Sequence, residues 1–158
     1  MPDYKDSRII ALDIGIKTVG IAVTDPLWLF PRPVGTIKRA DAIQKDLDEL
    51  QKICEQFFVA AFIVGWPLHS DGTETEITPI IRGFEKRVKK IYPETLFYHQ
   101  DERFSTKDAE EKISLKLKDR QKAKSSGRID SAAAAVILEN FMQIQLFREL
   151  KEKFLQIS

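Results

Sequence analysis

The chain has 158 residues, of which 43% are hydrophobic and 31% are charged, so we expect one folded domain rather than a disordered chain. Because 25 basic residues nearly balance 24 acidic ones, the net charge of +1 neither requires nor excludes a nucleic-acid partner. The single cysteine, Cys54, excludes a disulfide framework and a cysteine-based zinc site.

The first part of the chain predicts three strands and a helix. Residues 8–14 form a nearly continuous apolar run, which is typical of a strand buried on both faces. Only a short turn precedes a second strand over 19–24, so these two strands pair antiparallel. Pro31, Pro33 and Gly35 punctuate a third, short strand over 34–37. Apolar residues at three- and four-residue steps then indicate an amphipathic helix over 43–57.

Strands and helices alternate in the second part. Residues 58–64 predict a buried strand that stops at Gly65, and 77–91 predict a helix that Pro93 ends. A fifth strand over 95–99, a helix over 105–117 and a basic loop over 116–128 follow. The last helix begins at Ile129 and its pattern continues to Leu155, with these residues facing the core: Ala133, Val136, Ile137, Phe141 and Ile144.

This order of elements predicts an α/β domain. We expect a central mixed five-stranded sheet, with its first three strands antiparallel and helices on both faces. The order is that of the ribonuclease H-like fold, in a single domain 1–158 with a core of about 7–145 and a C-terminal helical extension over 146–158. Other α/β folds share much of this order, so function must be argued from the site.

Three acidic residues stand at the ends of predicted elements. Asp13 lies in the most apolar strand, where a carboxylate is costly unless it binds a cation, a partner or the amides of a turn. Glu102 follows the fifth strand, at the edge where open α/β sheets bind ligands, although Asp101 and Glu102 are also typical of a loop before a helix. Asp130 opens the last helix as either a cap or a ligand, and the alanines after it permit close packing.

Together the three acids favour a metal site. Carboxylates that converge on one point suit one or two Mg²⁺ or Mn²⁺ ions, and the chain has no cluster of histidine or cysteine as an alternative. Asp71, in the loop after the fourth strand, is an additional candidate ligand, or simply the first residue of an Asp-Gly turn.

Basic residues concentrate just before Asp130. The segment 116–128 has six basic residues and one acidic residue, which is typical of a solvated loop but also of a surface that holds phosphates next to a metal site. Our candidate nucleic-acid-binding residues are Lys17, Arg103, Lys116, Lys118, Arg120, Lys122, Lys124 and Arg128.

Four motifs, in order, resemble those of the YqgF/RuvX family over about residues 7–145. They are Ala-Leu-Asp-Ile-Gly at 11–15, Gly-Trp-Pro-Leu at 65–68, Asp-Glu-Arg-Phe-Ser-Thr at 101–106 and Ile-Asp-Ser-Ala-Ala at 129–133. The resemblance implies a ribonuclease H-like fold related to the RuvC resolvases, with Asp13, Glu102 and Asp130 in an acidic site that holds Mg²⁺ or Mn²⁺. Lys17-Thr18 and Trp66 depart from the family pattern without removing an acid.

The resemblance implies a nuclease that matures the 5′ end of precursor 16S rRNA, with Holliday junction cleavage as the alternative. A non-catalytic RNA-binding assembly factor is a third hypothesis, which has no need of three convergent acids. An ATP-using kinase of the actin-like type is excluded by length, because its fold needs two such domains. We expect a cytoplasmic monomer or homodimer without a membrane segment, since no apolar run approaches roughly 18 residues.

Overall fold

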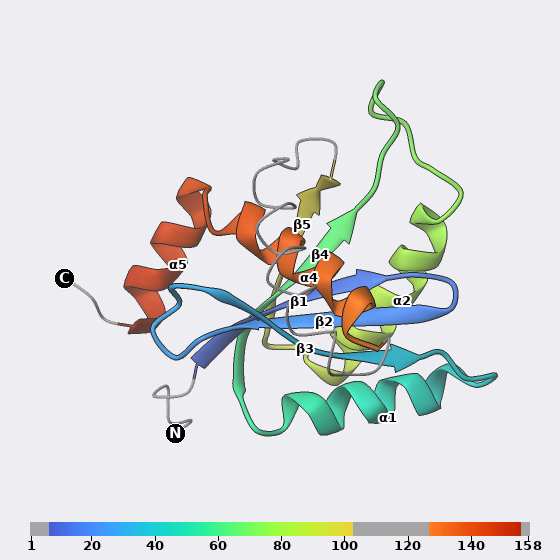
Figure 1. Cartoon of the computed structure of the whole chain (residues 1–158), viewed down its shortest axis with the longest axis horizontal. Helices are drawn as coiled ribbons and strands as arrows, with labels where there is room; N and C mark the ends of the chain where they lie inside the picture. The colour runs from blue at the N-terminus through green and yellow to red at the C-terminus, as the bar shows by residue number, and fades with distance from the viewer. Residues whose placement is uncertain (1–6, 103–126, 156–158) are drawn as a thin grey trace.

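The computed structural model describes residues 7–102 and 127–155, with the backbone alone over 127–130. Its five strands form one sheet in the order β3-β2-β1-β4-β5 (Figure 1). Strands β1 to β3 pair antiparallel, whereas β1 with β4 and β4 with β5 pair parallel, which confirms the predicted mixed sheet. The strands are β1 Ser7–Ile14, β2 Thr18–Thr24, β3 Pro31–Lys38, β4 Phe58–Trp66 and β5 Leu96–Asp101.

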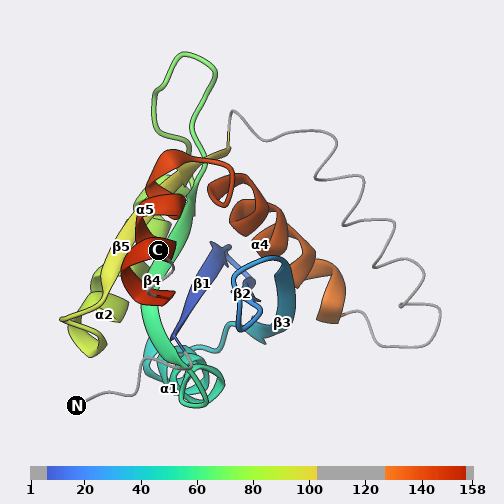
Figure 2. The ribbon, with the colours of Figure 1, turned by 90° about the vertical axis from the view of Figure 1, so that its left-hand side faces the viewer.

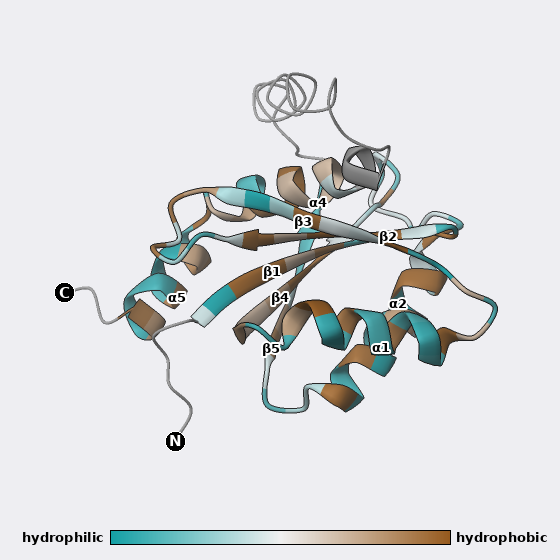
Figure 3. Ribbon diagram, turned by 60° about the horizontal axis from the view of Figure 1, so that its bottom comes forward, coloured by the Kyte–Doolittle hydropathy of each residue, from teal (hydrophilic) through white to brown (hydrophobic). Residues whose placement is uncertain are grey.

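Helices cover both faces of the sheet, as predicted. The helices α1 (Ile43–Cys54) and α2 (Thr78–Ile91) pack on one face, and α4 (Gly127–Phe141) and α5 (Gln145–Leu155) pack on the other. Figures 2 and 3 show these two layers. None of the helices described in the structure is long and apolar enough to cross a membrane.

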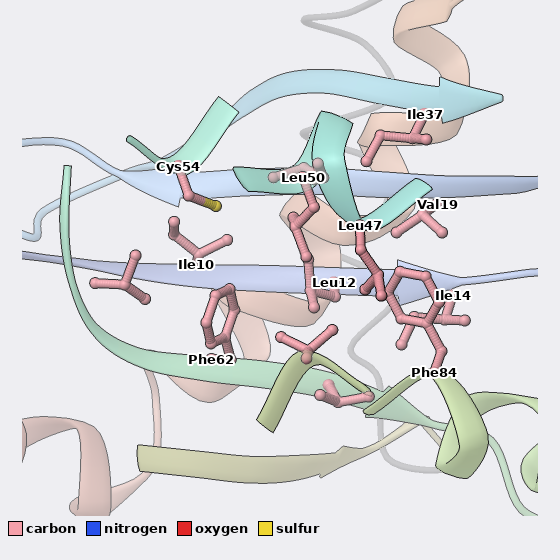
Figure 4. Close-up of a cluster of buried hydrophobic side chains, with 14 of the residues drawn as sticks. Ile10, Leu12, Ile14, Val19, Ile37, Leu47, Leu50, Cys54, Phe62 and Phe84 are labelled. Atoms are coloured by element: carbon pink, nitrogen blue, oxygen red, sulfur yellow. The ribbon is translucent and has the colours of Figure 1, made fainter. Parts of the chain in front are cut away.

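Alternate residues of β1 supply two different cores. Ile10, Leu12 and Ile14 face α1 and α2, where they pack with large side chains such as Phe62 and Phe84 (Figure 4). Since both faces of a central strand are covered, the strand is apolar at nearly every position, which explains the unbroken run in the sequence.

The other face is built from small residues. Ala11 of β1 and Ala61 of β4 lie against Ala134 and Ala135, and each of these four is fully buried. Small side chains on both surfaces let a helix approach a sheet closely. Asp13 lies two residues after Ala11, so strand alternation places it on this same face, beneath α4.

The structure corrects several predicted boundaries. The last helix does not continue to Leu155 as one element, because residues 142–144 separate α4 from α5. Ala133 is exposed and Ile144 is 39% exposed, whereas Ala134 and Leu138 face the core. Four consecutive alanines carry no periodic contrast, so their sequence could not define the buried stripe.

Strands β3 and β4 extend beyond their predicted bounds. β3 includes Pro31 and Pro33, which an edge strand tolerates because one side of its backbone has no partner strand. β4 continues through Gly65 to Trp66, and both residues pair with β5. The predicted helix over 105–117 and most of the basic loop over 116–128 lie outside the described residues.

Candidate active site

The structure brings two of the predicted acids together over β4. Asp13 is the last residue but one of β1, and Glu102 follows β5, with β4 between these strands. A Cβ atom built on Gly65 of β4 would lie only 2.5 Å from Glu102 Oε1. Glycine therefore leaves the space into which the Glu102 carboxylate reaches, toward the negative charge of Asp13.

This environment disfavours the charged form of Glu102. Burial, then the negative charge of Asp13, then that of Asp101 raise the pKa of Glu102 from 4.5 to about 7. Desolvation and a neighbouring like charge both penalise an ionised carboxylate. A group of acids held in this way is a candidate functional site, because a cation bound there would reverse the penalty.

Helix α4 packs on the face of the sheet that carries Gly65 and Glu102. Ile137 Cδ1 would also lie 2.5 Å from a Cβ on Gly65, so this helix touches the sheet where Glu102 reaches over it. Asp130 occupies the first turn of α4, about two turns before Ile137. Its side chain lies outside the described part of the structure, so its place beside Asp13 and Glu102 stays a prediction.

The turn between β1 and β2 is anchored beside Asp13. Gly15 N donates a hydrogen bond to Thr18 O over 2.8 Å. The Arg39 N–H donates to Lys17 O over 2.9 Å, and Arg39 Nη1 donates to Gly15 O over 3.0 Å. Arg39 Nε in turn lies 3.3 Å from Asp46 Oδ2 in the first turn of α1.

Sequence reasoning missed this role of Arg39 and Asp46. Asp46 is only 2% exposed, and its Oδ1 accepts a hydrogen bond from Ala40 N over 2.8 Å. The available signal was its spacing: Asp46 follows Ile43 by three residues and precedes Leu50 by four, on the apolar stripe of α1. A carboxylate on such a stripe requires a buried partner.

Asp71 lies at an exposed turn of the loop after β4. Its Oδ1 accepts hydrogen bonds from Thr73 N over 2.9 Å and from Thr73 Oγ1 over 2.6 Å. These bonds lower the pKa of Asp71. Within the described residues no group of three His, Cys, Asp or Glu has the arrangement of a metal site, so Asp71 does not complete one with Asp13 and Glu102.

Trp66 and His99 lie on the opposite face of the sheet from Glu102. Their rings stack with centroids 3.8 Å apart and planes 6° apart, and His99 Nε2 lies 2.6 Å from Glu85 Oε2. Burial acts to raise the pKa of Glu85, but hydrogen bonds from His99 and Lys89 outweigh it and hold the pKa below its usual value. This cluster joins α2 to the end of β5.

Among the predicted nucleic-acid contacts, Lys17 is exposed in the turn after β1. Arg128 lies in the first turn of α4, where the structure describes the backbone alone. The other predicted contacts lie outside the described residues and stay predictions: Arg103, Lys116, Lys118, Arg120, Lys122 and Lys124.

The donor chemistry at the site suits a hard divalent cation. Asp13 and Glu102 offer carboxylate oxygens, which are the ligands that Mg²⁺ and Mn²⁺ prefer. Burial, together with the neighbouring charges of Asp13 and Asp101, raises the pKa of Glu102, and a bound cation would oppose these effects. The two residues therefore fit the metal site that the sequence predicted.

Comparison with known proteins places this site in a family. Residues 7–144 match the family model described as "RuvX: Holliday junction resolvase". A "Putative pre-16S rRNA nuclease" of Salinibacter ruber is 34% identical over 137 residues, which are 87% of this chain and 93% of that protein. A protein of the same name from Sphingopyxis alaskensis is 37% identical over 132 residues, which are 84% of each chain.

Solved structures confirm the fold. A structure titled "T. thermophilus RuvC in complex with Holliday junction substrate" superposes with a TM-score of 0.55 at 15% identity, covering 95% of this chain and 94% of that one. A second, titled "Thermus thermophilus RuvC structure", gives a TM-score of 0.51 at 13% identity over 86% and 95% of the two chains. The fold is therefore ribonuclease H-like, as predicted, and the chain belongs to the RuvX family.

Proposed function

We propose that this protein is a divalent-cation-dependent nuclease that hydrolyses phosphodiester bonds in structured RNA. The observation that carries the proposal is the approach of the Glu102 carboxylate to Asp13 through the space above Gly65. Two like charges in a partly buried position penalise each other's ionised form, and a cation bound between them would turn that penalty into a favourable interaction. The nuclease names of the relatives support the same conclusion.

The residues that would hold the cation are Asp13, Glu102 and Asp130. When bound, Mg²⁺ or Mn²⁺ lowers the pKa of an attacking water and stabilises the negative charge on the leaving oxygen. The protein would hold these three carboxylates close together in their ionised form. Glu102 must release its proton to act as a ligand. With a pKa of about 7 it is only partly ionised near neutral pH, and a bound cation would lower that pKa.

We propose precursor 16S rRNA as the substrate, because the relatives are named for it. The family description favours a second candidate, a four-way DNA junction. Lys17 and the basic segment 116–128 would hold phosphates beside the cleaved bond in either case. All three acids belong to one chain, so a monomer or a homodimer would be active, and we expect it to act in the cytoplasm.

One experiment separates these functions. Purified protein is incubated with precursor 16S rRNA and with a four-way DNA junction, each with Mn²⁺ and with EDTA. We expect cleavage of the RNA with Mn²⁺ and none with EDTA or with Asp13→Asn. Glu94→Gln is the matched control, because Glu94 is an exposed acid in the turn between α2 and β5.

The other outcomes distinguish the alternatives. Cleavage of the junction alone would establish the resolvase hypothesis in place of RNA processing. Binding of RNA without cleavage by the unaltered protein would instead identify a non-catalytic assembly factor.

The basic segment has its own test. The variant replaces four basic residues with Gln: Lys118, Arg120, Lys122 and Lys124. It should weaken RNA binding similarly across sequences. The slope of log affinity against log salt concentration should become shallower by up to about one unit per lost phosphate contact. Urea unfolding of the variant provides the control for an effect on folding. Equal affinity and equal salt slope would show that this segment does not bind nucleic acid.

A further inference from the structure

Ile16 stands out at the turn between β1 and β2. Its side chain is 69% exposed, the highest exposure among the large hydrophobic side chains of the described residues. Isolated exposed apolar residues are common on protein surfaces and by themselves indicate nothing. Ile16 differs because it lies three residues after Asp13, at the edge of the sheet where the acidic site lies.

The backbone on both sides of Ile16 is held by one residue, Arg39. Arg39 Nη1 donates a hydrogen bond to the carbonyl of Gly15, and the Arg39 backbone N–H donates one to the carbonyl of Lys17. These two carbonyls belong to the residues directly before and after Ile16. The turn is therefore held at both ends of the exposed residue.

Arg39 contacts two further residues. Its guanidinium pairs with the buried carboxylate of Asp46 and lies 5.2 Å from the centre of the Phe84 ring. Helices α1 and α2 and the residue directly after β3 thus all contribute to the position of the turn. A surface held in one conformation before binding loses less conformational entropy when a partner docks.

We propose that Ile16 packs against the ribose and base beside the cleaved phosphate of an RNA strand, while Lys17 pairs with a neighbouring phosphate. This inference rests on the proposed nuclease function, because it needs a nucleic acid at the acidic site. Apolar side chains next to a phosphate-binding surface contact sugars and bases, and some insert between base steps. Arg39 serves as the positioning residue for this contact.

The test compares two exposed apolar residues at opposite ends of the sheet. Leu27 is 61% exposed in the turn between β2 and β3, so Leu27→Ser is the matched control for Ile16→Ser. The probe is a fluorescein-labelled RNA hairpin with a single-stranded 5′ extension. Binding is measured by anisotropy against salt concentration, in the Asp13→Asn background so that the probe stays intact.

We expect Ile16→Ser to weaken binding about tenfold, since a buried isoleucine side chain contributes that much or more. Its salt slope should stay unchanged, because no counterion is released at an apolar contact. Lys17→Gln should instead flatten the slope by about one unit. Ile16→Leu should retain affinity, and Leu27→Ser should bind like the parent.

Two results would overturn the inference. One is unchanged affinity of Ile16→Ser when the parent binds the probe, and in that case the nuclease proposal stands. The other is an equal loss of RNA affinity in Leu27→Ser, which would show that any polar substitution of an exposed apolar residue weakens binding. If the parent binds no RNA and the unaltered protein cleaves none, the nuclease proposal fails and this inference fails with it.

Discussion

Replacing Glu102 with glutamine tests the electrostatics of the site directly. The substitution keeps the shape of the side chain over Gly65 but removes its charge. In the folded protein the pKa of Glu102 is about 7, against 4.5 for the ordinary carboxyl group. We therefore expect Glu102→Gln to be more stable than the unaltered protein without metal at alkaline pH.

The sign follows from which state binds the proton. Below about pH 4.5 the carboxyl is protonated in both states, so its pKa has no effect on stability. Between pH 4.5 and about 7 the unfolded chain ionises first, so stability falls as pH rises, and the loss is complete above about pH 7. At 1.36 kcal/mol per pKa unit, the upper limit of the loss is about 3 kcal/mol.

The assay is urea unfolding at about pH 4 and at about pH 8, with EDTA present. We expect Glu102→Gln to exceed the unaltered protein by about 2–3 kcal/mol at the higher pH and to match it at the lower. Glu94→Gln, an exposed acid, should show no such difference. Added Mn²⁺ at about 100 times its Kd should stabilise the unaltered protein by about 2.7 kcal/mol and Glu102→Gln by less.

One result would refute this reasoning. If Glu102→Gln is no more stable than the unaltered protein at about pH 8, or exceeds it equally at both pH values, Glu102 is not held beside other negative charge.

Three further variants test other parts of the fold. Asp13→Asn should fold normally and lose nuclease activity by orders of magnitude, so cleavage at the normal rate would exclude the metal site. Gly65→Ala should cost about 1–3 kcal/mol in unfolding free energy and abolish the stabilisation by Mn²⁺, because a Cβ would collide with Glu102 and Ile137. Glu85→Gln should lower the free energy of unfolding by about 1–2 kcal/mol at neutral pH, and the difference should disappear as pH falls below 4.5. Urea unfolding followed by circular dichroism at several pH values measures this difference. A loss that does not depend on pH would contradict the prediction.

The sequence by itself determined the order of elements and the class of fold. The apolar runs of β1 and β4 and the periodic pattern of α1 are local signals that follow from burial on both faces or on one stripe. The motif around Asp13 and the Asp-Glu pair at the end of β5 likewise marked the acids, because a carboxylate at the end of a buried strand is costly without a function. Four motifs in the family's order specified the family.

Only the tertiary structure decided which residues support these acids. Gly65 provides the space for Glu102, and this depends on three neighbouring strands and on α4, which no local pattern encodes. Arg39 reaches the carbonyl of Gly15 across 24 residues, and Asp46 of helix α1 pairs with its guanidinium. Such contacts join residues that are distant in sequence, so their effect on position and pKa arises only once the chain has folded.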